Sequence, residues 1–245
     1  MLGFESEAIS TMDREQIRDN LLRVRERIGT AARKAGRRNE EITLIGVSKT
    51  QSADAIRAAY EAGLRHFGEN RVQEWEGKRA ALGDLQASWH LVGHLQSNKA
   101  ARAAGLFHSV DSLDDFALAQ RLDRARDGQN DGAKLRILLE VRVEEEESKT
   151  GVKFEEAAEL AEKVMALPRL QLAGLMCIPP YLADVEQVRP YFRRLRDLRD
   201  SLARTIGREL PVVSMGMSHD FEVAIEEGAT EVRVGTAIFG GRTAK

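Results

Sequence analysis

The chain has 245 residues, 42% hydrophobic and 31% charged, which is enough for one sizeable core and too short for two domains of ordinary size. Lysine and arginine number 37 against 39 acidic residues, so the net charge of −2 gives no general attraction to nucleic acid or an anionic membrane. A single cysteine, Cys177, excludes an internal disulfide, and no apolar run reaches the roughly 20 residues of a membrane span. The acidic N-terminus lacks the pattern of a secretory signal, and we expect a cytoplasmic protein.

The first expected element is a long amphipathic helix over residues 12–36. Its apolar side chains recur at steps of three and four residues, which places them on one face. The sequence GRRN at residues 36–39 then ends the helix. The apolar positions are Ile17, Leu21, Val24, Ile28, Ala31 and Ala35.

The rest of the chain alternates between short apolar runs, typical of buried strands, and helical patterns. Such alternation over about 200 residues indicates a parallel sheet, and eight repeats in a chain of this length favour a closed barrel. We therefore expect one α/β domain over residues 1–245, a (β/α)8 TIM barrel at about 41–241 preceded by the first helix. The strand runs are ITLIGVS, RHFGEN, SWHLVG, LFHSV, KLRILLEVRV, LQLAGLMCI, LPVVSMG and TEVRVGTAIFG. The helical patterns are residues 53–62, 71–82, 96–104, 113–126, 154–166, 185–204 and 219–227.

Lys49 stands at the exit of the first strand run, directly after Ser48. Burying an unpaired ammonium costs several kcal/mol, so lysine is a poor continuation of a buried strand. At a strand exit it is a candidate amine nucleophile that forms an imine with an aldehyde or ketone. The alternative is a lysine whose ammonium simply reaches solvent at the barrel rim. Taken alone, the residue favours this alternative.

The loops after the seventh and eighth strand runs form a candidate anion site. Barrels often bind phosphate there, where glycines let the backbone approach the ligand and hydroxyl groups add donors. One loop supplies Gly216 and Ser218, and the other supplies Gly235 and Thr236. The alternative is that the glycines only make turns and Ser218 only caps the next helix. Their joint placement opposite a strand-end lysine favours the ligand site.

Arg233 lies between two valines in the last strand run. A side chain at that position can point towards the barrel mouth, where a permanently charged guanidinium would donate to an unprotonated ring nitrogen. The alternative is a surface ion pair with Glu231, which would contribute little.

The other polar clusters carry weaker signals. His90 and His94 are four residues apart on a strand, which separates them by roughly 13 Å, and no third ligand is obvious. We therefore predict no metal site. The acidic run 144–147 is interpreted as solvated surface, and the adjacent Lys149 is a second candidate lysine near the mouth, a hypothetical transient acceptor for released cofactor.

Seven segments together resemble the pyridoxal phosphate homeostasis protein family (the YggS/PROSC group), which is related to the N-terminal barrel of alanine racemase. They are VSKTQ, HFGENRVQE, WHLVGHLQSNK, SKTGV, LAGLMCIPP, MGMSHDFEVAI and VRVGTAIFG, in the family's order and spacing. The resemblance covers about Glu41 to Gly241. It implies a fold-type III pyridoxal 5'-phosphate (PLP) barrel, in which Lys49 matches the Schiff-base lysine.

The same matching implies the remaining cofactor contacts. Ser218, Gly235 and Thr236 fall on phosphate-binding positions. Arg233 falls on the residue that faces the pyridine nitrogen, and Asn70 lies near the phenolic oxygen. The family's role implies a PLP carrier or buffer in intracellular homeostasis, with PLP-dependent apoenzymes as possible partners and a monomeric state.

Two other functions stay open, an amino-acid racemase-like PLP enzyme and a cofactor-free Schiff-base aldolase. Pyridoxal phosphate stabilises a carbanion best with a protonated ring, which an arginine at the nitrogen resists. Related racemases use a tyrosine base from a second domain, which we do not expect here because the chain ends at Lys245. Tyr181 follows the sixth strand and is a possible base, whereas Tyr60 and Tyr191 lie in helical patterns as packing residues.

We assign no catalytic residue. Three positions depart from the family pattern, namely Arg142 in place of a commoner Asn, and His219 and Phe221 in place of Asp and Met. Because Arg142 stands at the exit of the fifth strand run, we assign no residue on that side of the pocket. His219 is interpreted either as a helper to the bound anion or as an exposed first-turn histidine.

Overall fold

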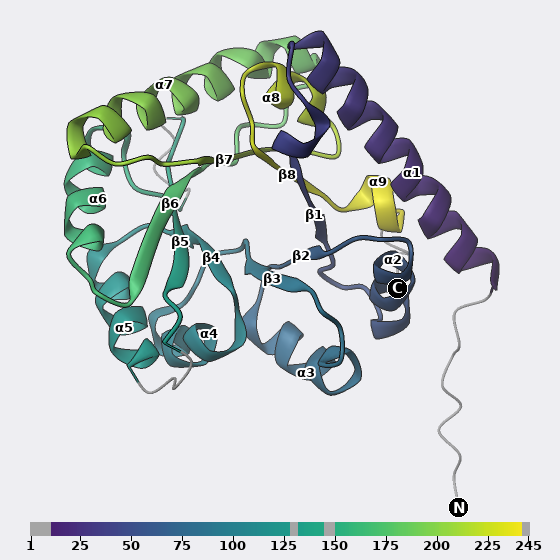
Figure 1. Cartoon of the computed structure of the whole chain (residues 1–245), viewed down its shortest axis with the longest axis horizontal. Coiled ribbons are helices and arrows are strands. Elements are labelled where there is room, and N and C mark those ends of the chain that lie inside the picture. The colour runs from purple at the N-terminus through teal and green to yellow at the C-terminus, as the bar shows by residue number, and fades with distance from the viewer. Residues whose placement is uncertain (1–10, 128–131, 145–149, 242–245) are drawn as a thin grey trace, which may run out of the picture.

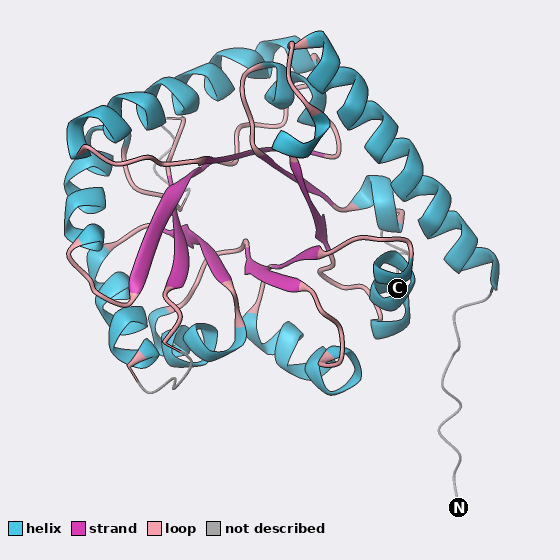
Figure 2. Ribbon diagram, viewed as in Figure 1, coloured by secondary structure: helices cyan, strands magenta, loops and turns pink. Residues whose placement is uncertain are grey.

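Eight parallel strands close into a barrel in the order β1 to β8, and helices form an outer layer around it (Figure 1). The computed structural model describes residues 11–127, 132–144 and 150–241. Figure 2 shows the strands enclosed by helices, which confirms the expected (β/α)8 barrel with an additional N-terminal helix. The strands are β1 Thr43–Val47, β2 His66–Glu69, β3 Ser88–Leu91, β4 Ser109–Leu113, β5 Leu135–Glu140, β6 Leu170–Met176, β7 Val212–Met217 and β8 Glu231–Val234.

Each strand is followed by a helix in the described part of the chain, with short 3-10 turns before some of them. The helices are α1 Thr11–Lys34, α2 Ala53–Glu61, α3 Val72–Leu82, α4 Ala100–Leu106, α5 Phe116–Arg126, α6 Ala157–Met165, α7 Arg189–Ile206, α8 Phe221–Glu226 and α9 Thr236–Phe239. The 3-10 turns are Asn39–Glu41, Ser97–Lys99, Phe154–Glu156 and Val185–Val188. None of the helices among these residues combines the length and apolar character needed to cross a bilayer.

Most element boundaries differ from the sequence expectation by a few residues, and the ends of β4 and β8 illustrate why. Leu113 ends β4 and does not begin a helix, because every residue of β4 is buried and the strand therefore shows no two-residue period to mark its end. The eighth apolar run is a strand only as far as Val234, and the short helix α9 follows after Gly235.

Helix α1 covers the side of the barrel where the first and last strands meet, and it packs against α2, α8 and α9 (Figure 1). Its predicted apolar face is buried, with Leu21 and Val24 each only 1% exposed. The helix ends at Lys34, and Gly36 follows with φ of 68°, the left-handed conformation that commonly terminates helices.

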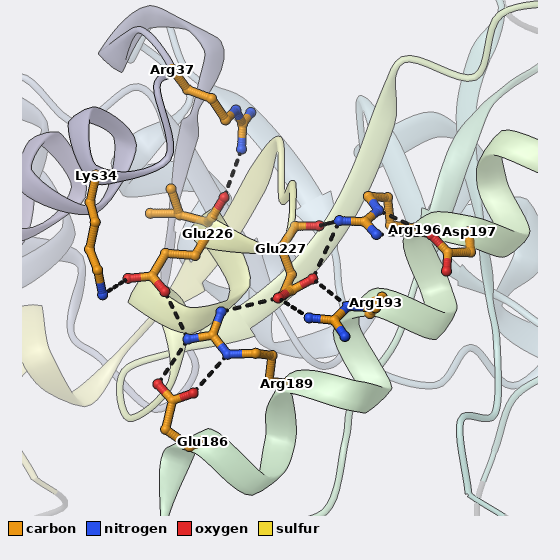
Figure 3. Close-up of polar contacts among 10 residues, drawn as sticks. Lys34, Arg37, Glu186, Arg189, Arg193, Arg196, Asp197, Glu226 and Glu227 are labelled. Carbon is orange, nitrogen blue, oxygen red and sulfur yellow. Dashed lines mark hydrogen bonds and ion pairs between the residues drawn. The ribbon is translucent and has the colours of Figure 1, made fainter.

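An ion-pair network on the outer layer fixes α8 to α1 and α7 (Figure 3). Glu226 of α8 accepts from Lys34 Nζ at 2.6 Å and from Arg189 Nη2 at 2.8 Å. The next carboxylate, Glu227, is shared by Arg189 at 3.1 Å, Arg193 at 3.0 Å and Arg196 at 3.3 Å. The arginine-rich face of α7 therefore contacts carboxylates as well as solvent. Because α8 follows the loop after β7, the network also supports that loop.

Glu227→Gln should lower the free energy of unfolding by about 1–3 kcal/mol at pH 7, because its side chain is only 7% exposed and three guanidinium groups lose their shared charge. Burial acts to raise the pKa of the Glu227 carboxyl, but hydrogen bonds from Arg193 and Arg189 outweigh it and leave the pKa below its usual value. The carboxylate thus stabilises the fold above its unfolded pKa of about 4.3, and this contribution disappears as the pH falls further.

Urea unfolding of wild type and variant at pH 7 and at acidic pH measures the effect. Asp197→Asn is the matched control, since this carboxylate is 61% exposed and contacts Arg196 at 3.0 Å. We expect the control to change the unfolding free energy by less than about 0.5 kcal/mol. Equal losses in the two variants would contradict the interpretation.

Candidate functional site

The exits of the eight strands meet at one end of the barrel, and Lys49 lies there, two residues after β1. Its side chain is half-buried. Among the described residues, its ammonium has neither a hydrogen-bond acceptor nor a carboxylate partner. The structure thus presents an amine at the barrel mouth that no side chain of residues 11–127, 132–144 or 150–241 engages.

The turn that carries Lys49 is held from below by a buried carboxyl. Ser48 donates through its N–H to Gly68 O at 2.9 Å and through its hydroxyl to Glu69 Oε1 at 2.7 Å. Lys78 of α3 donates to both the Ser48 carbonyl and Glu69 Oε1, each at 2.9 Å. Lys78, from a neighbouring helix, therefore fixes the backbone next to Lys49.

The residue after Lys49 is also restrained. Thr50 has φ of 64°, a left-handed conformation that is uncommon for a residue other than glycine. Its N–H donates to the Glu74 carboxylate, which lies 3.5 Å from Lys78 Nζ. Sequence reasoning missed this restraint, although Glu74 and Lys78 are four residues apart in a helical pattern, which is the spacing of an ion pair.

Glu69 is fully buried, and its second oxygen has no partner among the described residues. Burial raises the pKa of this carboxyl, while the ammonium of Lys78 and the hydroxyl of Ser48 act in the opposite direction. The carboxyl therefore depends on Lys78 to remain in a buried position.

The two loops expected to form an anion site contact each other directly. Ser218 Oγ accepts from the N–H of Gly235 at 3.2 Å and from the N–H of Ala237 at 3.3 Å. Because these bonds use its acceptor positions, the hydroxyl proton remains to be donated. Thr236, the first residue of α9, is exposed beside them.

Ser218 does not cap the helix that follows it. That helix begins at Phe221, and the Asp220 side chain instead accepts from the Met217 N–H at 2.6 Å. Gly216 has φ of 91°, and a Cβ there would lie 2.6 Å from the Ala224 Cβ, so the loop requires glycine for both conformation and space.

Arg233 lies inside the barrel, 4% exposed, opposite Ile45 of β1. Its Nη1 donates to Ser214 Oγ and its Nη2 to Cys177 O, both at 2.7 Å. The alternative of a surface ion pair with Glu231 is wrong, because the Glu231 carboxylate accepts from Arg136 Nη2 at 2.6 Å.

Asn70 follows β2 and is half-buried at the edge of the mouth. The exit of β3 packs closely against it, since a Cβ on Gly93 would lie 2.5 Å from the Asn70 carbonyl oxygen. Asn70 and His94 line one cavity of about 540 Å³ between the β2 and β3 exits. His94 is 3.5 Å from Asp114.

A buried polar cluster in the barrel interior was not predicted. His90 Nδ1 lies 3.2 Å from Asp111 Oδ2, and its Nε2 lies 3.1 Å from His66 Nδ1. One ligand-type atom each from His90, Asp111 and Glu231 lie within 4.8 Å of one another, so third ligands do exist near His90. The guanidinium of Arg136 already lies in this cluster, hydrogen-bonded to Glu231 and 3.5 Å from His90 Nδ1.

This cluster is better explained as an internal ion-pair network than as a metal centre. Burial, together with the neighbouring His90 and Arg136, lowers the pKa of His66 to about 4, so that this ring is neutral at physiological pH. Glu231 and His66 begin their strands, which places the cluster towards the amino-terminal end of the barrel, where polar groups usually serve stability. His94 lies at the carboxyl-terminal end of the barrel, so His90 and His94 occupy separate environments.

The three tyrosines and His219, which the sequence analysis considered as site residues, lie in different surroundings. Tyr60 and Tyr191 pack against the core as expected. Tyr181 is 79% exposed, and its ring lies 4.8 Å from that of His219, whose Nε2 is 3.0 Å from Leu182 O. His219 is thus exposed and bonded to a neighbouring loop.

Strand β5 leads to a segment of which only part is described. Arg142 Nη2 donates to Gly151 O at 3.2 Å, which ties the two ends of that segment together. Lys149 and the acidic residues 145–147 lie outside the described residues.

Comparisons with known proteins identify the family. Residues 12–243 match the family model of the alanine racemase N-terminal domain. A pyridoxal phosphate homeostasis protein of Aquifex aeolicus (strain VF5) is 49% identical over 91% of this chain and 97% of its own length. The structure of PipY from Synechococcus elongatus PCC7942 with PLP bound aligns with a TM-score of 0.81 at 37% identity, covering 91% of this chain and 100% of PipY.

A more distant match shows the fold alone. Alanine racemase from Clostridium difficile 630 aligns with a TM-score of 0.67 at 15% identity, covering 94% of this chain and 58% of the racemase. Fold and family model together define a barrel of the alanine racemase N-terminal type. The chain belongs to the pyridoxal phosphate homeostasis protein family, which confirms the resemblance seen in its motifs.

Lys78→Met should lower the free energy of unfolding by about 2 kcal/mol, because the fully buried Glu69 would lose its cation. Adding Glu69→Gln should recover part of the loss, since the carboxyl that needed the cation is gone. Urea unfolding followed by circular dichroism measures both.

The control for this prediction is Lys163→Met on α6, where the ammonium contacts Glu159 and the side chain is 48% exposed. We expect this exposed pair to contribute less than about 1 kcal/mol. A Lys78 variant as stable as the Lys163 variant would show that Glu69 does not depend on Lys78.

Proposed function

We propose that the chain binds pyridoxal 5'-phosphate covalently through Lys49 and acts as a carrier or buffer in its intracellular homeostasis. The observation that carries this proposal is the unengaged Lys49 amine at the same barrel mouth where Ser218 joins two donor-bearing loops. The names of the relatives and the PLP-bound PipY structure support it. We further propose that residues 1–245 act as one cytoplasmic, monomeric domain that delivers cofactor to PLP-dependent apoenzymes.

The residues present fit the chemical groups of this cofactor. Ser218 has a hydroxyl proton left for a phosphate oxygen, and Gly235 and Thr236 form the adjoining backbone. Arg233 has five N–H groups, and Ser214 and Cys177 engage two of them, which leaves donors for a ring nitrogen. We assign the phenolic oxygen to Asn70 on the other side of Lys49.

The bound cofactor supplies an aldehyde carbon for amines and an electron sink for carbanions. This chain favours holding the aldehyde over carbanion chemistry. Arg233 is permanently charged and donates hydrogen bonds, so it opposes protonation of the ring nitrogen. Tyr181 is 79% exposed with its ring tilted against that of His219, and burial raises the pKa of Cys177 to about 12, so neither is placed as a base.

The first test of this function is the absorption spectrum of the purified protein with added PLP, followed by borohydride reduction and peptide mapping. We expect an absorption band that the protein lacks without PLP, and after reduction a stable label on Lys49. Lys49→Ala should lose both, whereas Lys163→Ala on the exposed face of α6 should retain them. A label spread over several lysines, or its persistence in Lys49→Ala, would overturn the assignment.

A second test addresses the phosphate site. Ser218→Ala should weaken binding of PLP about tenfold and leave the binding of pyridoxal, which has no phosphate, nearly unchanged. Equilibrium dialysis with the two aldehydes measures the ratio. Ser201→Ala on the exposed face of α7 is the control and should leave the ratio intact. Equal weakening of both ligands by Ser218→Ala would place the phosphate elsewhere.

A further inference from the structure

A cavity beside the predicted cofactor site shares only Asn70 with the function proposed above. It has a volume of about 540 Å³, within the usual range of small-molecule sites, and it lies between the connections that follow β2 and β3. The lining residues with polar side chains are Asn70, Arg71, Gln73, His94, Gln96 and Lys99.

The charges of this lining favour an anion. Two cations, Arg71 and Lys99, line the cavity, and no aspartate or glutamate does. Neither cation has a carboxylate within ion-pair distance in the part of the chain that the structure describes. One lining residue, His94, lies 3.5 Å from the carboxylate of Asp114, which is only 14% exposed. Burial raises the pKa of the Asp114 carboxyl, and the neighbouring His94 acts in the opposite direction.

The neutral polar side chains suit a carboxylate in particular. The amides of Gln73 and Gln96 each provide an NH₂ donor, and a guanidinium such as Arg71 binds a planar carboxylate with two parallel hydrogen bonds. Amide, guanidinium and ammonium donors therefore line one cavity that can hold a small acid.

The position of the cavity relates it to Lys49. Strands β7, β8, β1, β2 and β3 are neighbours around the closed barrel (Figure 1). The predicted phosphate loops follow β7 and β8, Lys49 follows β1, and the cavity lies between the exits of β2 and β3. Asn70, assigned to the cofactor's phenolic oxygen, belongs to the cavity lining as well. A cofactor that extends from Ser218 to Lys49 would thus have the cavity on its far side.

We propose that this cavity is a second anion subsite, which binds the carboxylate of a small amino acid or 2-oxo acid beside the cofactor, with Arg71 and Lys99 as its charged contacts. Its location beside the cofactor rests on the proposed function, whereas carboxylate binding itself does not. The subsite gives the protein a means to sense the acids that PLP enzymes consume and produce.

The experiment is an NMR titration of the ¹⁵N-labelled, cofactor-free protein with malonate, with chloride used to keep the ionic strength constant. We expect saturable shifts of the side-chain amides of Asn70, Gln73 and Gln96. Arg71→Gln and Lys99→Gln should each weaken binding about five- to tenfold. The control is Arg79→Gln, an exposed arginine on α3, the helix that follows Arg71, and outside the cavity; it should leave the affinity unchanged.

Matched ligands identify the group that is recognised. Alanine and pyruvate should both shift the same amides, and the acid with the lower dissociation constant identifies the source of the carboxylate. Ethylamine, which is alanine without its carboxylate, should cause no shift. Binding of ethylamine, or a loss of affinity in Arg79→Gln equal to that in Arg71→Gln, overturns the subsite.

The outcome is separable from that of the proposed function. If PLP labels Lys49 but malonate causes no shift, the subsite is wrong and the cofactor site stands. If malonate binds in the cavity but PLP does not label Lys49, the carboxylate site stands and its assignment beside a cofactor falls.

Discussion

The buried Glu69 carboxyl is the constraint on which the candidate site depends. A fully buried carboxyl requires a cation, and Lys78 supplies it from α3 while also donating to the Ser48 carbonyl. Strand β2, helix α3 and the turn after β1 are therefore fixed by a single ammonium group. Because Lys78 engages this acid, the ammonium of Lys49 at the mouth has no carboxylate partner within the described part of the chain. Lys78 thus supports the turn, and Lys49 is left for the ligand binding proposed above.

The two ends of the barrel interior use polar groups in opposite ways. On β8, Glu231 and Arg233 are two residues apart and both lie inside, but each has a different partner. Glu231 closes an internal network with Arg136, which satisfies most of that cluster within the protein. Arg233 uses two of its donors on Ser214 and Cys177 and keeps the others. The amino-terminal end is thus closed on itself, while donors remain available towards the carboxyl end.

The sequence predicted the barrel because alternation of strand and helix patterns is a property of neighbouring residues. It also predicted that Lys49 and the Ser218 loop would lie at one end, since parallel strands share their exits. It did not predict the Glu69 and Lys78 pair, because nine residues separate them and their contact depends on how α3 packs on β2. The network around His90 was missed for the same reason, since its members come from five different strands.

Carrying and catalysing place different demands on the same lysine. A catalyst needs a base fixed opposite the amine and a ring nitrogen that accepts a proton, whereas a carrier needs only a strong anchor for the phosphate and an accessible imine carbon. The described residues favour the second set: Ser218 joins two loops into one anchor, Lys49 is only half-buried, and no tyrosine is fixed opposite it. On the function proposed above, exchange with an incoming amine would require access to Lys49 but no base fixed opposite it.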